Sequence, residues 1–135
     1  MKVLAYGDIL NQGNSVFAAV AYADGDMLLL ALRGVIRIEN PYLYLQPFID
    51  ELSAKLAEIS IAKVELDFTK LRFCNSNGFY VIMDIVEAIY RLSSGPVTIR
   101  RLDDDDWHQE TLPILVDIAS EEVSARTRFE SQLEA

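Results

Sequence analysis

The stretch Lys63–Tyr90 reads KVELDFTKLRFCNSNGFYVIMDIVEAIY, and its hydrophobic spacing changes partway along. At its start, Val64, Leu66 and Phe68 alternate with acidic residues, and this period of two predicts a half-buried strand. From Gly78 onward the period becomes helical. The apolar stripe of that predicted helix consists of Phe79, Ile82, Met83, Val86, Ile89 and Tyr90.

The polar turn between this strand and this helix, Asn75–Gly78, is the candidate site. A short turn of this kind leaves the first backbone N–H groups of the helix without partners and directs the positive end of the helix dipole at them. Phosphorylation of Ser76 would add roughly 1.5 to 2 negative charges beside those donors without any need to unfold the domain. The simpler alternative is that Asn75 or Ser76 only caps the helix and that Gly78 relieves steric crowding.

The same stretch resembles the STAS domain, the fold of anti-sigma factor antagonists and of the cytoplasmic tails of sulfate transporters. In that family, a strand ending in Asp-Leu-Ser and a short link with an aromatic residue precede Asp-Ser-x-Gly at the start of a helix. The serine takes phosphate from a partner kinase. Asp67 corresponds to the strand aspartate and Phe73 to the aromatic residue. Ser76 corresponds to the phosphoacceptor and Gly78 to the glycine, while Asn75 stands where the family commonly has aspartate.

Two apolar runs of strand length come earlier in the chain, Ser15–Ala23 and Met27–Leu32. They flank residues 24–26, Asp-Gly-Asp, which favour a tight hairpin. The second run has almost no polar face, so we expect it in the interior of the sheet. An amphipathic helix is predicted over Leu45–Ile59, with Pro47 either in its first turn or at a break.

The chain after the second helix predicts one more strand and one more helix. Val97–Leu102 alternates again, and the right-handed crossover rule places it parallel to the strand at residues 64–68. Trp107–Ala119 predicts a weaker helix interrupted by Pro113. The acidic run Asp103–Asp106 is expected to be a solvated loop whose last aspartate caps that helix.

These elements predict a single α/β domain with a mixed sheet of four to five strands and helices mainly on one face. Such a fold is STAS-like and is entered through an N-terminal hairpin. Residues 1–14 are an N-terminal extension to which the sequence assigns no structure, and residues 15–119 form the STAS-like domain. Residues 120–135 are expected to be a helical or frayed tail.

Composition narrows the classes of function. The chain has 135 residues and a net charge of −9, which argues against binding to nucleic acids or anionic membranes. Its longest apolar run is far too short to cross a bilayer, and the start of the chain lacks the features of a signal peptide, so a cytoplasmic protein is expected. The only histidine, His108, is expected on the surface, and the only cysteine, Cys74, is expected as a small core residue. No metal site, cofactor or catalytic constellation is predicted.

The resemblance implies a regulator of the anti-sigma factor antagonist type. Such a protein binds a serine kinase or anti-sigma-like partner around Ser76, is released by phosphorylation of that serine, and is restored by a phosphatase. The turn residues Asn75, Asn77 and Gly78 would belong to the partner surface, with Glu39 and Asn40 as rim contacts. Two alternatives remain open: a scaffold or homodimerisation module without the switch, and a binder of a nucleotide or lipid beside the Ser76 helix.

Overall fold

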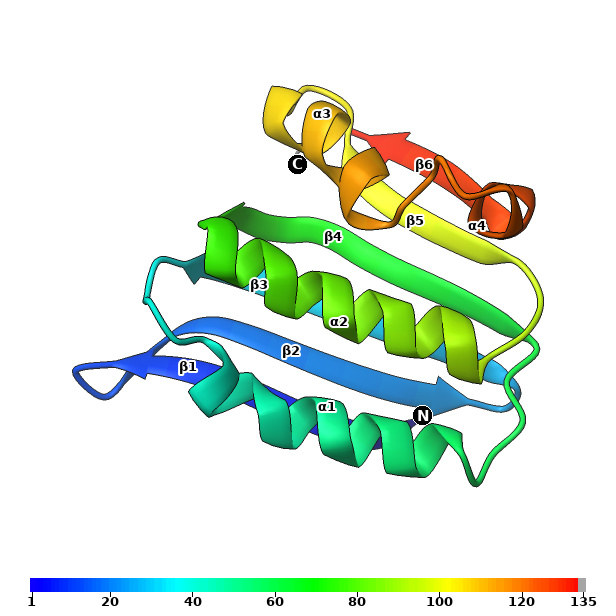
Figure 1. Cartoon of the computed structure of the whole chain (residues 1–135), viewed down its shortest axis with the longest axis horizontal. Coiled ribbons are helices and arrows are strands. Elements are labelled where there is room, and N and C mark those ends of the chain that lie inside the picture. Colours follow the sequence, from blue (N-terminus) through cyan, green and yellow to red (C-terminus); the bar gives the residue numbers. More distant parts are fainter. Residues whose placement is uncertain (134–135) are drawn as a thin grey trace.

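Six strands in one mixed sheet and a layer of helices make up the computed structural model, which describes residues 1–133 (Figure 1). The strands are β1 (Lys2–Asn11), β2 (Asn14–Asp24), β3 (Met27–Ile36), β4 (Lys63–Cys74), β5 (Val97–Leu102) and β6 (Thr127–Gln132). The helices are α1 (Tyr42–Leu56), α2 (Ser76–Leu92), α3 (Asp106–Leu115) and α4 (Glu121–Arg126).

The strands lie in the sheet in the order in which they occur in the chain. The predicted hairpin is confirmed, because β2 and β3 pair antiparallel with Asp24 opposite Met27 and with Gly25 at φ 62° in the turn. β1 also pairs antiparallel with β2, whereas β3, β4, β5 and β6 are parallel neighbours. β3 therefore lies inside the sheet, as its apolar faces predict.

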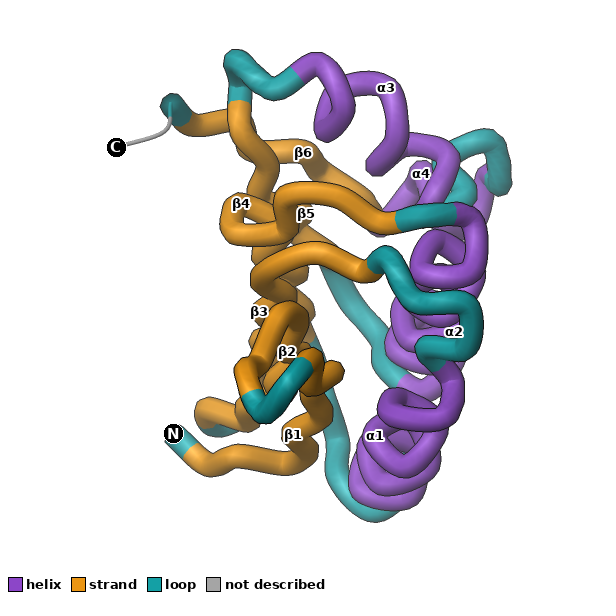
Figure 2. The backbone as a smooth tube through the Cα atoms, turned by 90° about the vertical axis from the view of Figure 1, so that its left-hand side faces the viewer, coloured by secondary structure: helices purple, strands orange, loops and turns teal. Residues whose placement is uncertain are grey.

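The α/β architecture with helices on one face is confirmed, but the sheet has six strands rather than four or five. The additional strands come from the two ends of the chain. β1 belongs to residues 1–14, to which the sequence assigned no structure, and β6 follows α4 in the expected helical or frayed tail. Figure 2 shows all the labelled helices on the same side of the sheet, so the opposite face carries no helix within the described residues.

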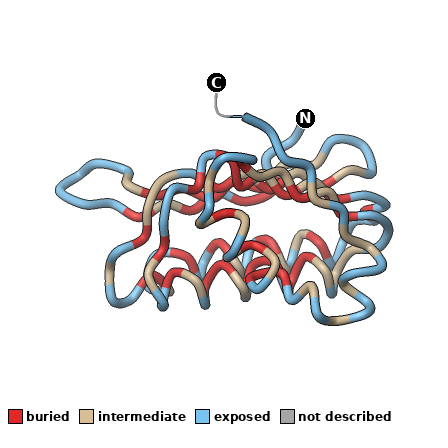
Figure 3. The backbone as a smooth tube through the Cα atoms, turned by 90° about the horizontal axis from the view of Figure 1, so that it is seen from above, coloured by how far each residue is buried: buried red, intermediate tan, exposed pale blue. Residues whose placement is uncertain are grey.

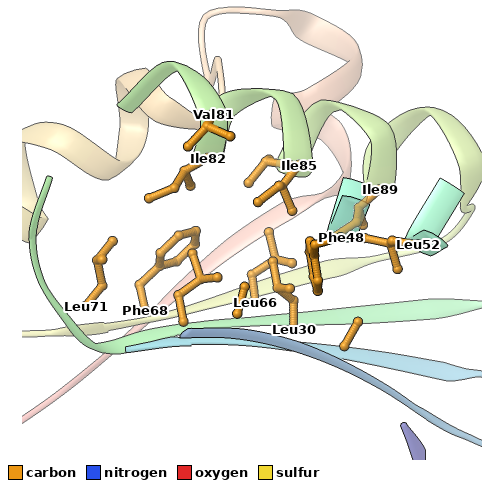
Figure 4. Packing of buried hydrophobic residues seen from close by; sticks show 14 of the residues in the cluster. Leu30, Phe48, Leu52, Leu66, Phe68, Leu71, Val81, Ile82, Ile85 and Ile89 are labelled. Carbon is orange, nitrogen blue, oxygen red and sulfur yellow. The ribbon is translucent and has the colours of Figure 1, made fainter. Parts of the chain in front are cut away.

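The core lies between the sheet and the helices (Figure 3). Leu30, Leu66 and Phe68 point from the strands toward α2, and Figure 4 shows how their side chains meet it. The helical residues that bury completely against them are Val81, Ile82, Ile85 and Ile89. These are the apolar positions of a helix with one face turned to the sheet, and they supply most of its stabilisation.

The first helix begins and ends three residues earlier than predicted, and Ile59 lies outside it with 40% of its surface exposed. Pro47 neither lies in the first turn nor breaks the helix. It occupies the second turn, where its missing N–H leaves the carbonyl of Leu43 without its helical donor. Leu43 is 70% exposed, so water can hydrate that carbonyl and the proline is tolerated.

The prediction that His108 lies on the surface is wrong, because its side chain is completely buried. Nδ1 accepts a hydrogen bond from the Leu102 N–H at 3.0 Å, and Nε2 donates to the Leu71 carbonyl at 2.7 Å. The cap of α3 also differs by one residue from the prediction. Asp105, not the last aspartate of the acidic run, accepts from the His108 N–H, and Asp106 is the first residue of the helix.

Candidate functional site

The candidate serine, Ser76, is the first residue of α2, close to the end of strand β4. β4 extends to Cys74, so Asn75 alone separates the strand from the helix. Asn75 is extended, with φ −73° and ψ −177°, which is the backbone geometry of an N-cap residue. The helix begins at Ser76, two residues before Gly78, and Ser76 is exposed.

Hydrogen bonds of Asn75 cap α2 and tie the turn to the end of β3 and to the loop after it. Its Oδ1 accepts from the Gly78 N–H at 2.8 Å, and its own N–H donates to the Ile36 carbonyl at 2.9 Å. Its Nδ2 donates to the Ile38 carbonyl at 3.0 Å. The two side-chain bonds require an amide, because a carboxylate accepts but cannot donate. Asparagine at this position therefore serves both as a helix cap and as a bridge to the loop after β3.

The loop after β3 lies against the start of α2. Asn77 Nδ2 donates to the Glu39 carbonyl at 2.6 Å, so Glu39 sits beside the second residue of the helix. Glu39 and Asn40 are both exposed, and the Asn40 carbonyl accepts from the Leu43 N–H at 3.2 Å. The structure thus brings the predicted rim residues and the predicted turn residues to the same end of the sheet (Figure 1).

Close packing, and not an unusual backbone angle, requires glycine at position 78. A Cβ atom at this position would lie 2.8 Å from the Cβ and Cγ2 atoms of Ile36 and 2.9 Å from the Cβ atom of Cys74. Those distances are shorter than any ordinary van der Waals contact. The glycine therefore lets α2 approach the ends of β3 and β4, and it relieves crowding as the simpler interpretation of the turn proposed.

Two backbone donors at the start of α2 remain for an incoming group. Of the first four helical amides, that of Gly78 is bonded to the Asn75 side chain and that of Phe79 to the Asn75 carbonyl. The amides of Ser76 and Asn77 precede the first residue that can bond within the helix. The positive end of the helix dipole lies at the same place, so the exposed Ser76 hydroxyl sits in an environment that favours negative charge.

An aromatic surface next to Ser76 was not predicted as a whole. A pocket of about 210 Å³ between α2 and α3 is lined by Cys74, Asn75, Ser76, Phe79, Tyr80, Trp107 and Thr111. Tyr80 is 57% exposed. Beside the pocket, the rings of Phe73 and Trp107 are 6.2 Å apart, and the Arg37 guanidinium lies 5.4 Å from the Phe73 ring. Of the aromatic residues on this surface, the sequence identified only Phe73 as a site residue, through its resemblance to the STAS pattern. The exposure of Tyr80 could have been predicted, because Tyr80 lies off the apolar stripe of the helix.

Cys74 lies beneath this turn and is buried, as expected of a core residue. Burial raises the pKa of its thiol to about 11, because the low-dielectric surroundings disfavour the thiolate. Near neutral pH the side chain is therefore a protonated, poorly nucleophilic thiol. It packs against the turn and does not act as a reactive group.

Other kinds of site find little support in the part of the chain that the structure describes. Within residues 1–133, His, Cys, Asp and Glu side chains form no group of three or more that could hold a metal ion. The same residues include no helix with the length and apolar character needed to cross a membrane. Their buried side-chain nitrogen and oxygen atoms all have hydrogen-bond partners, so no orphaned polar atom points to a missing ligand.

The fold is similar to that of two solved structures. One, an NMR structure of the protein TM1081, is 13% identical and aligns with a TM-score of 0.47 over 83% of this chain and 79% of the other. The second is an anti-sigma factor antagonist from Mycobacterium paratuberculosis, 11% identical, with a TM-score of 0.45 over 82% of this chain and 93% of the other. The sequence matches no protein-family model, and no curated protein matches it significantly.

Proposed function

We propose that the chain is a regulatory, non-enzymatic protein–protein interaction domain of the anti-sigma factor antagonist type, switched by phosphorylation of Ser76. The observation that carries the proposal is the exposed Ser76 hydroxyl at the first position of a helix of 17 residues. The sequence resemblance assigns this position to the phosphoacceptor. The proposed partner is a cytoplasmic serine kinase or anti-sigma-like protein, with a phosphatase to reverse the modification.

Phosphorylation at this position is expected to leave the fold intact. The phosphate would stand beside the amides of Ser76 and Asn77 and at the positive end of the helix dipole, which stabilises nearby negative charge by about 0.3 to 1 kcal/mol. In a complex the same group would lie in an interface. Unless cations of the partner meet it there, its desolvation costs several kcal/mol of binding free energy. The switch would thus act on association and not on folding.

The surface proposed for the partner surrounds Ser76. The turn residues Asn75, Asn77 and Gly78 form its centre, and Glu39 and Asn40 form its rim through the bond between Asn77 and the Glu39 carbonyl. The neighbouring pocket adds Tyr80 and Trp107. Aromatic side chains in such positions often dominate the energetics of protein interfaces, so these two residues are the proposed anchors.

The experiment is intact-mass measurement after incubation with ATP and a lysate of the organism that encodes the chain. The expected result is an increase of about 80 Da, the mass of one phosphoryl group, that the Ser76→Ala variant abolishes. Ser124→Ala is the matched control, because Ser124 is also exposed and helical but lies in α4. It should acquire the same mass increase as the unsubstituted protein.

An unchanged mass would count against the switch and in favour of a scaffold or homodimerisation module. The bridge made by Asn75 is the observation on which that alternative depends, because it commits the position to structure and leaves it without the charge of the family's aspartate. In that case Ser76→Glu should not alter the oligomeric state or the binding of any partner found.

A further inference from the structure

In two rows of paired residues, the helix-free face of the sheet is divided into an uncharged half and a mostly charged half. Residues paired across neighbouring strands share a face, so the register defines rows on it. One row runs Tyr6, Val20, Ala31, Asp67, Arg100 and Glu130 from β1 to β6. A second runs Val3, Tyr22, Leu29, Glu65, Thr98 and Arg128. Both rows are uncharged from β1 to β3 and mostly charged from β4 onward.

The apolar half is hollowed into a pocket of about 570 Å³, which we name the bare-face pocket. Its lining residues are Val3, Tyr6, Ala18, Val20, Tyr22, Ala31, Leu32, Arg33, Asp67 and Lys70. The two alanines make room, and the two tyrosines contribute larger walls. A mostly apolar concavity of this size with a few polar groups at one side is typical of small-molecule sites.

The polar side of the pocket carries two cations next to each other. Arg33 on β3 pairs directly with Lys70 on β4, and both are exposed. A register shift between Ala31 and Arg33 brings Lys70, and not Thr69, opposite Arg33. Bulges that redirect side chains in this way occur frequently at functional sites.

Paired like charges on adjacent strands destabilise a sheet, and neither cation forms an ion pair within residues 1–133. Asp67 does not neutralise them by an ion pair: its Oδ1 accepts from the N–H and the hydroxyl of Thr69 at 2.9 and 2.6 Å. Asp8 lies in the same row as Arg33 but two strands away and outside the pocket. In a chain with 21 acidic and 12 basic residues, this pair is a local positive site.

We propose that the bare-face pocket binds a single amphipathic carboxylate, whose hydrocarbon body lies over Ala18, Val20 and Ala31 and whose carboxylate meets Arg33 and Lys70. Apolar burial supplies affinity, and the two cations select the charged head group. The site is on the opposite face of the sheet from the helices and is independent of the proposed switch at Ser76.

Isothermal titration with decanoate and with 1-decanol, both as monomers, tests the proposal. Decanoate should bind saturably at one site per chain. Arg33→Gln combined with Lys70→Gln should weaken decanoate binding at least about tenfold and leave 1-decanol binding unchanged, because two charge-assisted hydrogen bonds are lost. Ala31→Phe, which fills the pocket but keeps both cations, should weaken both ligands.

The controls separate this site from the rest of the molecule. Arg91→Gln removes an exposed cation from α2 on the helical side and should leave decanoate affinity unchanged, as should Ser76→Ala. Each variant is first checked for the unfolding transition of the parent protein. A folded double variant that binds decanoate as tightly as the parent would overturn the proposal.

Three further outcomes would also overturn it. The first is an absence of saturable decanoate binding. The second is a dimer by light scattering that Tyr6→Lys dissociates and decanoate does not, which would assign the face to a second copy of the chain. The third is binding to phosphatidylglycerol vesicles without binding to monomeric decanoate, which would assign it to a bilayer surface.

Discussion

Single residues decide the geometry of the proposed switch. Asn75 is the clearest case, because one side chain caps α2 and bridges to Ile38, a residue 37 positions earlier in the chain. The sequence predicted the cap, since polar residues before an apolar helix commonly have that role. It did not predict the bridge, because no local pattern shows that the loop after β3 lies beside the start of α2.

The substitution Asn75→Asp should destabilise the protein. Asn75→Asp keeps the cap and gains about 0.3 to 1 kcal/mol from the helix dipole. However, it sets a carboxylate oxygen against the Ile38 carbonyl and leaves that carbonyl without its donor, which costs about 1 to 3 kcal/mol. Urea unfolding at neutral pH should therefore show a net loss of about 1 kcal/mol. A variant as stable as the parent would show that the bridge contributes nothing.

Gly78→Ala should destabilise the protein although alanine is the better helix former by about 1 kcal/mol. The new Cβ atom would meet Ile36 at 2.8 Å, and moving α2 away to accommodate it costs about 1 to 3 kcal/mol of packing. Glu87→Ala, at an exposed position of the same helix, is the control and should change the unfolding free energy by less than about 0.5 kcal/mol. Equal effects of the two substitutions would contradict the crowding.

Among the strands and helices, those with a hydrophobic pattern that repeats over many residues were predicted best from the sequence. The hairpin at β2 and β3 and the unit β4–α2–β5 were predicted because alternation, helical spacing and turn residues agree over many residues. β1 was missed because an irregularity in its pairing between Val3 and Ala5 interrupts the alternation. β6 was missed because an edge strand such as TRFESQ is mostly exposed and carries no apolar run.

The third helix depends on His108, whose burial no spacing rule reveals. His108→Phe fills a similar volume but leaves the Leu71 carbonyl and the Leu102 N–H unpaired inside the protein. We expect a loss of about 2 to 5 kcal/mol in the free energy of unfolding and faster hydrogen exchange at the Leu102 amide. Glu110→Ala, exposed on the same helix, is the control. An unchanged rate of hydrogen exchange at the Leu102 amide would show that the His108 side chain does not protect that amide.

Within residues 1–133, the molecule is a single layer of helices on a single sheet, so its two faces can carry different functions. The fold class followed from the sequence, but the bare-face pocket did not. It depends on residues of β1, β2, β3 and β4 that come together only through the register. The proposed partner surface remains a prediction. Its residues could be named from the sequence because most of them lie within the turn at Asn75–Gly78 and the loop after β3.

Global stability should fall at alkaline pH through Cys74. Burial raises the pKa of this thiol from 9.0 to about 11, so the folded state holds the proton more tightly than the unfolded chain does. The stabilisation is complete below pH 9 and is lost as the pH rises to about 11, for a total of roughly 2 to 3 kcal/mol. Denaturant unfolding across this range, compared with Cys74→Ala, measures the effect.

The comparison should use slopes against pH, because Cys74→Ala also changes packing. The variant should lose the part of the fall that begins near pH 9. It should retain a fall that begins near pH 10, since burial also raises the pKa of Tyr42 from 10.0 to about 12 and that of Tyr90 in the same direction. Parallel curves for the two proteins would exclude a buried, protonated thiol.

The sequential strand order has a consequence for folding during synthesis on the ribosome. Each strand pairs with the strand that precedes it in the sequence. During synthesis on the ribosome, the pairing partner of each new strand has therefore already been translated. No strand must wait for a distant segment, and we expect pulse-labelling during synthesis to detect protected amides in the first hairpin before β4 has been translated. The segment β4–α2, which contains Ser76, would then pack against strands β1 to β3 that are already paired.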